Sequence, residues 1–374
     1  MRIILDLRIF GVEYGGLGRY NQKLLEYLMQ IDKSNQYILL FKTRPDNLIL
    51  PDNFKIKICN FHWYSFQEQL RLPFILKKLK PDLVHFPHFN VPLFYRGRFV
   101  LTIHDLIMTK YPSQKASTLN KLFFVIKRWG YQITIKSAVR RAAKIIAVSK
   151  FTAQDIKNYF SPKASQPPLG SESRGRGLAD KISVIYEGVS EARDPEEVSG
   201  LPDKFLFYVG NAYPHKNLAF LLTVFEEFKK SHPDFYLILA GQTSYFYERL
   251  KKQAGSHVIF TGLLSDAQLA WYYQKATAYI FPSLYEGFGL PPLEAMSYHL
   301  PVLSSHSSCL PEVLGNAALY FDPQNLQDCL DKLEQIINNK DLRQKLIIAG
   351  GTQIKKYDWQ KMASATFEIY KNLL

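Results

Sequence analysis

Two carboxylates, Glu286 and Glu294, bracket a segment rich in glycine and proline in the second half of the chain. The segment follows an apolar run at Ala278–Phe281, which predicts a buried strand, and leads into a helical pattern. Gly287 and Gly289 let the backbone approach a ligand closely, and the two prolines that follow suit the first turn of a helix. Free N–H groups at a helix start bind anions, whereas carboxylates accept hydrogen bonds from hydroxyls. Together these features predict a ligand with both an anionic group and hydroxyls, as in a nucleotide sugar.

Lys216 is the second candidate, within the segment Tyr208–Asn217. We expect a strand that ends at Gly210 and a following helix that Asn217 caps. Lys216 then stands at the mouth of a cleft, where it can neutralise a departing diphosphate. A lone lysine is more often an ordinary surface residue, but a strand-loop-helix turn favours the functional interpretation.

The first half offers two more candidates. Gly15 and Gly16 follow the first predicted strand and open a helix, so their N–H groups can meet a diphosphate. The run is not a G-x-G-x-x-G fingerprint, and an ordinary tight turn is the alternative. His104 follows the predicted strand Phe99–Ile103 and should point into a cleft, although a hydrogen-bonded core histidine is also compatible with the pattern. Asp105 can cap the turn that follows.

Other chemistries find little support in the sequence. A carboxylate pair can hydrolyse glycosides, but eight positions across a loop and a helix start could hold the two too far apart. There is no Gly-x-Ser-x-Gly, His-Glu-x-x-His or Walker A motif, and no Asp-x-Asp to seat a metal-bound diphosphate. The three cysteines lack metal-ligand spacing. We therefore expect neither a metal nor a cofactor.

The composition is that of a soluble globular protein, with 47% hydrophobic and 21% charged residues. A length of 374 residues favours two domains. No apolar run is long enough to span a bilayer, and the charged start, Met1–Arg8, resembles a core strand more than a secretory signal. Few cysteines fit a reducing compartment, so we expect a cytoplasmic location.

The net charge of +14 is concentrated in the first half of the chain. Residues 1–200 carry 31 Lys and Arg against 17 Asp and Glu, whereas residues 201–374 carry 16 of each. No acid occurs between Asp105 and Asp155, and aromatic residues such as Trp129 lie among the basic ones. A solvated basic helix and an anionic membrane surface, met at the inner face of the membrane, are both compatible with this pattern. Nucleic acid is not expected as a partner, because no nucleic-acid-binding motif accompanies the charge. The basic residues between the two acids are Lys110, Lys115, Lys121, Lys127, Arg128, Lys136, Arg140, Arg141, Lys144 and Lys150.

Short apolar runs alternate with longer amphipathic ones in two cycles, which predicts an α/β class with two parallel, doubly wound sheets. The predicted strands are Ile3–Leu7, Tyr37–Phe41, Leu83–Phe86, Phe99–Ile103, Lys144–Val148 and Ile182–Ile185, then Phe205–Val209, Phe235–Ala240, Val258–Phe260, Ala278–Phe281 and Val302–Leu303. The predicted helices are Leu17–Met29, Phe66–Leu79, Leu119–Arg141 and Phe151–Tyr159, then Asn217–Lys230, Tyr245–Gln253, Ser265–Lys275 and Leu293–Tyr298, with a helical end from Gln324.

Domain limits follow from this alternation. Residues 192–203 form a polar linker, and residues 161–180 break the pattern as a surface insertion. We expect an N-terminal domain at 1–195, completed by a terminal helix at 357–374, and a C-terminal domain at 200–356. Ligands of such sheets bind beyond the carboxyl ends of the strands, so a cleft between the two domains is expected to hold the site.

The motifs, taken together, resemble the retaining GT-B glycosyltransferases of the family-4 type over nearly the whole chain. Glu286 and Glu294 resemble that family's E-x7-E signature, and Gly15-Gly16 is similar to its N-terminal phosphate loop. Further matching landmarks are Ala147–Thr152, Val184–Val189 and Gly210–Asn217, and the terminal helix with Trp359 resembles the family's return to the first domain. The resemblance implies two Rossmann-like domains that face each other across a cleft.

The resemblance also implies roles for individual residues. Glu286 would bind hydroxyls of the donor sugar, Glu294 the ribose, and His104 the sugar near its reacting carbon. Lys216 would hold the diphosphate, and backbone near Gly262 would meet the base. Asn211 occupies a position where many members carry a phosphate-binding arginine, and Arg19 is a candidate substitute. Further N–H donors to the diphosphate would come from Gly16, Phe288, Gly289 and Leu290.

The implied function is retaining transfer of a sugar from a nucleoside diphosphate to a hydroxyl of a glycan or lipid-linked acceptor, in cell-surface polysaccharide synthesis. GDP-mannose is favoured over UDP-sugars, because the Gly210–Asn217 turn resembles bacterial mannosyltransferases. The alternatives are a nucleotide-sugar epimerase or a phosphorylase of the same fold, and an inactive protein that binds nucleotide sugar or membrane.

Overall fold

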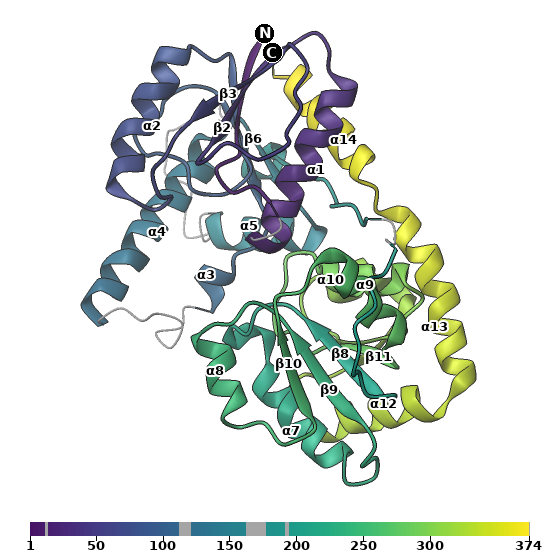
Figure 1. The fold of residues 1–374 in the computed structure, drawn as a ribbon. Helices are drawn as coiled ribbons and strands as arrows, with labels where there is room; N and C mark the ends of the chain where they lie inside the picture. Colours follow the sequence, from purple (N-terminus) through teal and green to yellow (C-terminus); the bar gives the residue numbers. More distant parts are fainter. Residues whose placement is uncertain (12–13, 112–120, 162–176, 191–193, 374) are drawn as a thin grey trace. The chain divides into compact units, whose positions relative to one another are not determined.

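The computed structural model describes residues 1–11, 14–111, 121–161, 177–190 and 194–373. Most of the predicted 161–180 insertion, residues 162–176, lies outside the described residues. The chain divides into two compact units (Figure 1). The first comprises Met1–Thr109, Leu119–Gly188 and Trp359–Leu374, and the second comprises Lys110–Thr118 and Val189–Asp358.

The first unit is built on a seven-stranded parallel sheet with the order β3-β2-β1-β4-β5-β6-β7. Its strands are β1 (Arg2–Asp6), β2 (Gln36–Phe41), β3 (Phe54–Ile58), β4 (Leu83–Phe86), β5 (Phe99–Ile103), β6 (Lys144–Ala147) and β7 (Ile182–Val184). The order reverses direction between β1 and β4. In doubly wound sheets the ligand crevice lies at this reversal, beyond the carboxyl ends of the strands.

Residues 42–53 and 87–98 join two pairs of these parallel strands without a helix, whereas the other four connections run through helices. The unit's helices also include the last described helix of the chain, which follows the second unit. They are α1 (Gly15–Ile31), α2 (Phe66–Leu79), α3 (Ile107–Lys110), α4 (Lys121–Arg141), α5 (Lys150–Phe160), α6 (Leu178–Lys181) and α14 (Trp359–Lys371). Serine side chains cap α2 and α5, where Ser65 accepts from the Glu68 N–H and Ser149 from the Thr152 N–H. The last helix, α14, packs against α1 (Figure 1). Among the described residues, no helix is both long and apolar enough to cross a bilayer.

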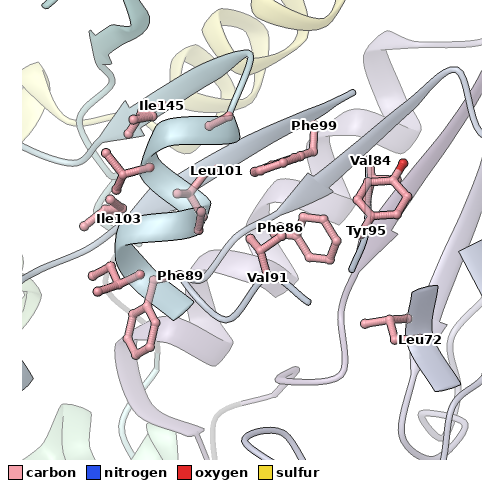
Figure 2. Close-up of a cluster of buried hydrophobic side chains, with 14 of the residues drawn as sticks. Leu72, Val84, Phe86, Phe89, Val91, Tyr95, Phe99, Leu101, Ile103 and Ile145 are labelled. Carbon is pink, nitrogen blue, oxygen red and sulfur yellow. The ribbon is translucent and has the colours of Figure 1, made fainter. Parts of the chain in front are cut away.

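The core of the first unit lies between the strands and these helices. Figure 2 shows part of it, with Phe86 of β4 and Phe99, Leu101 and Ile103 of β5 in one buried cluster. Leu72 of α2 belongs to the same cluster. These strands are buried on both faces, as expected for parallel strands covered by helices. The cluster therefore holds β4 and β5 in place, and with them the residues that follow.

The second unit repeats the architecture with a six-stranded parallel sheet of order β10-β9-β8-β11-β12-β13. Its strands are β8 (Phe205–Val209), β9 (Tyr236–Ala240), β10 (Val258–Gly262), β11 (Ala278–Phe281), β12 (Val302–Ser305) and β13 (Ala318–Phe321). Its helices are α7 (Leu218–Phe228), α8 (Tyr245–Lys251), α9 (Asp266–Lys275), α10 (Leu290–Ser297), α11 (Leu310–Leu314), α12 (Leu326–Asn338) and α13 (Lys340–Gln353). Here the order reverses between β8 and β11.

The predicted class, α/β with two doubly wound parallel sheets, is confirmed. Two strands escaped the prediction, β3 and β13, and both lie at the edge of a sheet. The predicted cap at Asn217 is wrong in its chemistry. Asn217 precedes α7, but its side chain does not accept from that helix and instead donates to the Pro323 carbonyl at 2.9 Å. Its left-handed backbone, with φ of 59°, is a conformation that asparagine tolerates better than most residues.

Candidate functional site

Lys216 and Glu286 lie beyond the carboxyl ends of β8 and β11, the two strands at the reversal of the second sheet. Lys216 ends a short 3-10 turn, Pro214–Lys216, that separates β8 from α7. Glu286 lies in the loop between β11 and α10. The topology thus brings together two residues that are 70 positions apart in the sequence, in the crevice where ligands of such folds bind.

The two side chains form an ion pair, with 2.6 Å between Lys216 Nζ and Glu286 Oε1. Their exposed fractions are only 13% and 9%. Lys216 Nζ also lies 5.6 Å from the centre of the Phe281 ring, a favourable cation–π distance. An ammonium has three N–H donors, so the lysine can hold Glu286 and still donate to a ligand oxygen.

Backbone contacts hold the loop that carries Glu286. The Leu284 N–H donates to the His215 carbonyl at 2.7 Å, which ties this loop to the turn of Lys216. The Glu286 N–H donates to Ser308 Oγ at 2.9 Å. Burial, with the neighbouring Lys216 charge, lowers the pKa of His215 to about 4. His215 is therefore neutral at pH 7 and leaves Lys216 as the positive charge of the turn.

Helix α10 begins directly after this loop, at Leu290. Pro291 and Pro292 fill its first turn as predicted, and neither has an N–H to offer. The donors at this helix start are therefore the N–H groups of Gly289 and Leu290, together with that of Phe288 before them. Gly289 has a φ of 93°, and a Cβ there would lie 2.9 Å from Leu310 Cδ2. Only glycine fits this position without strain.

The remaining predicted residues of the second unit lie along the same edge of the sheet. Glu294, in the second turn of α10, accepts from Tyr273 Oη at 3.5 Å. Asn211 follows β8 and is exposed, and its Oδ1 accepts from the Tyr213 N–H at 3.2 Å. Gly262 ends β10, where its carbonyl accepts from the Gly241 N–H at 2.9 Å.

The other predicted residues belong to the first unit. Gly15 and Gly16 open α1 and are exposed. Gly15 has a φ of 62°, which a residue with a side chain rarely adopts. Within the described part of the chain, no side-chain cap or acidic residue occupies the first turn of α1. Its N-terminal N–H groups and helix dipole are therefore suited to an anion.

His104 follows β5, and its partners were not foreseen from the sequence. Its Nδ1 lies 2.8 Å from Glu187 Oε1, and its Nε2 lies 3.1 Å from the Pro87 carbonyl. Glu187 is buried and follows β7. The ring of Tyr20 contacts His104 edge-on, with 4.7 Å between ring centres. Glu187 thus orients the imidazole. The available signal was an acidic residue just beyond a short apolar run, in the landmark Val184–Val189.

The described residues contain no group of three His, Cys, Asp or Glu side chains arranged to hold a metal ion. Within the second unit the structure pairs Lys216 with Glu286, and within the first unit it pairs His104 with Glu187. Glu286 and Glu294, the two carboxylates of the signature, have different partners.

Comparison with known proteins decides the family. The model described as "Glycosyl transferases group 1" matches residues 190–353, and the one described as "Glycosyltransferase Family 4" matches residues 14–165. The chain belongs to these glycosyltransferases. The first model covers Lys216, Glu286 and Glu294, and the second covers Gly15, Gly16 and His104.

The individual relatives are similar to this chain at 30% identity or less. The serotype-specific mannosyltransferase WbdA of Escherichia coli is 30% identical over 245 residues, which are 63% of this chain but 29% of the length of WbdA. The O-antigen chain mannosyltransferase RfbU of Salmonella typhimurium is 26% identical over 356 residues, or 89% of this chain and 91% of RfbU. The sucrose-phosphate synthase of Thermosynechococcus elongatus has the same fold, with a TM-score of 0.75 and 17% identity over 100% of this chain and 99% of that one. The fold is thus GT-B, with two Rossmann-like parallel-sheet domains.

Proposed function

We propose that this group 1 glycosyltransferase moves a sugar, with retention of configuration, from a nucleoside diphosphate to a hydroxyl of a glycan or lipid-linked acceptor. The observation that carries the proposal is the Lys216–Glu286 pair at the reversal of the second sheet. One side chain matches the charge of a diphosphate and the other accepts hydrogen bonds from sugar hydroxyls. Glu294 is assigned to the ribose, and the backbone at Gly262 to the base.

The proposed reaction begins when the bond between the anomeric carbon and the diphosphate stretches, which leaves an oxocarbenium-like centre. The leaving diphosphate gains negative charge. Lys216 and the N–H groups of Gly289 and Leu290 stabilise that charge because they are fixed before the reaction starts. The acceptor hydroxyl attacks from the face that the diphosphate leaves, and a phosphate oxygen takes its proton. On the first unit, His104, oriented by Glu187, is assigned to the donor sugar.

Mannose is the donor sugar we propose, as GDP-mannose. The support is that WbdA and RfbU, which are similar to this chain, are both named mannosyltransferases. The enzyme would then act in the synthesis of a surface polysaccharide.

The net charge of residues 201–374 is zero, in contrast to the basic first half of the chain. An anionic membrane surface is the proposed docking partner of the first unit. On α4, Ile126 and Trp129 are exposed beside Lys127 and Arg128. Apolar side chains among basic ones bind the interface of anionic lipid. No acid occurs between Asp105 and Asp155 to oppose this attraction. Lipid-linked acceptors would then be concentrated where the enzyme sits.

The catalytic proposal is tested by nucleotide release from GDP-mannose, UDP-glucose and UDP-N-acetylglucosamine without an acceptor, together with thermal shifts by GDP and UDP. We expect slow release of nucleotide from one donor and a rise in melting temperature with the matching nucleotide, because a ligand of the native state stabilises it. A chain that shows neither a shift nor turnover with any donor would refute the proposal.

The membrane proposal is tested by co-sedimentation with vesicles of phosphatidylcholine containing 30% phosphatidylglycerol. We expect binding that weakens as salt rises from about 0.1 to 1 M and that falls in the double variant Ile126→Ser, Trp129→Ser. Ile348→Ser is the matched control, because Ile348 is an exposed aliphatic residue on α13 of the second unit. Vesicle binding that changes neither with salt nor in the double variant would contradict the membrane proposal.

A further inference from the structure

A small cavity lies at the reversal of the first sheet, between the residues that follow β1 and those that follow β4. The volume that a water-sized molecule can occupy in it is about 20 Å³. A space of this size admits one water molecule or one hydroxyl group, but no sugar ring. Arg8 and Ile9 line it from the β1 side, and His88 and Asn90 line it from the β4 side. The remaining lining residues are Asp6, Asn21, Trp63, Phe86 and Pro87.

A buried charge network forms the wall of this cavity. The Arg8 guanidinium donates to both carboxylate oxygens of Asp6, at 2.7 and 2.6 Å, and to Glu68 Oε1 at 2.6 Å. The other oxygen of Glu68 accepts from the Tyr64 N–H at 2.8 Å and from Asn90 Nδ2. Burying the charges of this network costs free energy. A buried charge network that lines a cavity therefore suggests a functional role.

Two polar atoms of the lining residues have no hydrogen-bond partner among the described residues, Arg8 Nη1 and Asn21 Oδ1. Arg8 is only 4% exposed and Asn21 only 1%. Asn21 is held by its other amide atom, because Nδ2 donates to the Ile9 carbonyl at 2.6 Å. Leaving a buried polar group unpaired costs about 1–3 kcal/mol, and more when it is charged. Two residues that line the cavity thus retain unpaired groups, the N–H donors of Arg8 Nη1 and the acceptor Asn21 Oδ1.

The charge of the wall selects the kind of ligand. One guanidinium faces the carboxylates of Asp6 and Glu68, and burial raises the pKa of Glu68 while Arg8 opposes that rise. The network has no net positive charge in either protonation state of Glu68. Burial also lowers the pKa of His88 to about 3, so this lining residue is neutral at pH 7. A phosphate or carboxylate is therefore disfavoured, whereas a hydroxyl can both accept from Arg8 and donate to Asn21.

Trp63 supplies an apolar surface at the same cavity. It is half-buried, and its ring is held edge-on by Tyr14, with 5.4 Å between ring centres. Lys42 Nζ lies 5.7 Å from the ring centre. Aromatic rings combine a broad apolar contact with few rotatable bonds, which suits the C–H face of a sugar.

We infer that this cavity is the acceptor subsite, in which a hydroxyl of an uncharged acceptor sugar enters between Arg8 and Asn21 while the sugar ring rests against Trp63. The inference rests on the proposed function and adds the chemical class of the acceptor group. It places a neutral sugar, and not the phosphate of a carrier, at the reversal of the first sheet.

The test is saturation-transfer NMR on the full chain with methyl α-glycosides of mannose, glucose, galactose and N-acetylglucosamine, with methyl glucuronide and inorganic phosphate as charged probes. The variants are Trp63→Ala and Asn21→Leu. Phe94→Ala is the control, because Phe94 is an exposed aromatic of the first unit that does not line the cavity. Melting curves check that each variant folds. If Asn21→Leu does not fold, Trp63→Ala alone provides the test. Thermal shifts by GDP and UDP report on the donor side independently.

We expect at least one neutral glycoside to bind the wild-type chain and Phe94→Ala, and to bind each cavity variant at least tenfold more weakly. Equal binding to Trp63→Ala and wild type, no binding of any neutral glycoside, or displacement of the glycoside by phosphate would overturn the inference. A thermal shift by a nucleotide without glycoside binding would refute the acceptor subsite and leave the proposed function standing. Glycoside binding that needs these residues, without any nucleotide shift, upholds the cavity as a sugar site and counts against the proposed function.

Discussion

Replacement of Lys216 by alanine is the perturbation whose consequences the structure defines best. The ammonium is paired with Glu286 at 2.6 Å and is 13% exposed. At the effective dielectric constant of about 20 that suits such sites, two unit charges about 4 Å apart interact by roughly 4 kcal/mol. If Lys216 stands at that distance from the departing diphosphate, its loss should raise the barrier by about 3–4 kcal/mol, or roughly a hundred- to thousandfold in kcat.

Two further variants separate charge from structure. Lys216→Arg keeps the positive charge but changes its shape, so we expect partial activity. Glu286→Gln keeps an acceptor for Lys216 while it removes the negative charge, and should cut turnover less than Lys216→Ala. Lys204→Ala is the matched control, because Lys204 pairs with Asp234 at 2.6 Å and the two side chains are 56% and 55% exposed. Its loss should cost less than about 1 kcal/mol of stability and no activity.

The assay is release of nucleotide from the donor, with melting curves and nucleotide thermal shifts for every variant. Breaking a buried ion pair destabilises a protein by about 3–5 kcal/mol, and this pair is partly open to solvent, so the folded state should survive with a lower Tm. If folded Lys216→Ala turned over within a few fold of wild type and gave the same nucleotide shift, the assignment of Lys216 to the diphosphate would be wrong.

Four other outcomes follow from the structure. Glu187→Gln should lower kcat about 10- to 100-fold and move its pH profile, with little change in Tm, because Glu187 orients His104; an unmoved profile would reduce Glu187 to a packing role. His85 is fully buried between Tyr370 and Thr102, and burial lowers its pKa to about 3. The unfolded chain therefore binds more protons below its pKa of about 6.5, so stability is complete above pH 6.5 and falls on acidification, by about 2 kcal/mol at pH 5. In denaturant titrations, wild type should lose about 2 kcal/mol more unfolding free energy between pH 7.5 and pH 5 than His85→Gln loses. Equal losses in the two proteins would show that His85 is not the group responsible. Gly289→Ala should cost about 1–2 kcal/mol in the same titration, because of the φ of 93° and the contact with Leu310; an unchanged midpoint would show that the loop relaxes freely. Turnover should persist in excess EDTA, and its loss with recovery on added Mg²⁺ would show that a metal assists the diphosphate.

Much of the fold was predictable because burial on both faces makes central parallel strands read as continuous apolar runs. Strands β4, β5, β8 and β11 have the predicted bounds. The edge strand β3 was missed because the prediction followed continuous apolar runs, whereas Phe54–Ile58 alternates apolar residues with lysines, a pattern that itself indicates a half-exposed strand. Charged, exposed edges are how sheets avoid pairing with other chains, so an edge strand carries lysines that the central strands of the same sheet lack.

The parts of the site formed by residues adjacent in sequence were predictable, whereas the parts that depend on tertiary contacts were less so. The helix start at Leu290 and its prolines followed from local sequence. The ion pair between Lys216 and Glu286 did not, since each residue had been given a ligand and no protein partner. Glu187 and Arg8 were also passed over, because an isolated charge after an apolar run has no partner until the sheet is assembled. Asp6 and Arg8, two apart at the end of the first strand, were the available signal for the cavity network.

A crystal structure of the full chain with GDP or UDP tests the central claim most directly. The account predicts that the diphosphate lies within hydrogen-bond distance of Lys216 Nζ and of the N–H groups of Gly289 and Leu290, with the ribose at Glu294. A nucleotide bound away from the reversal between β8 and β11, with Lys216 still paired only to Glu286, would contradict it.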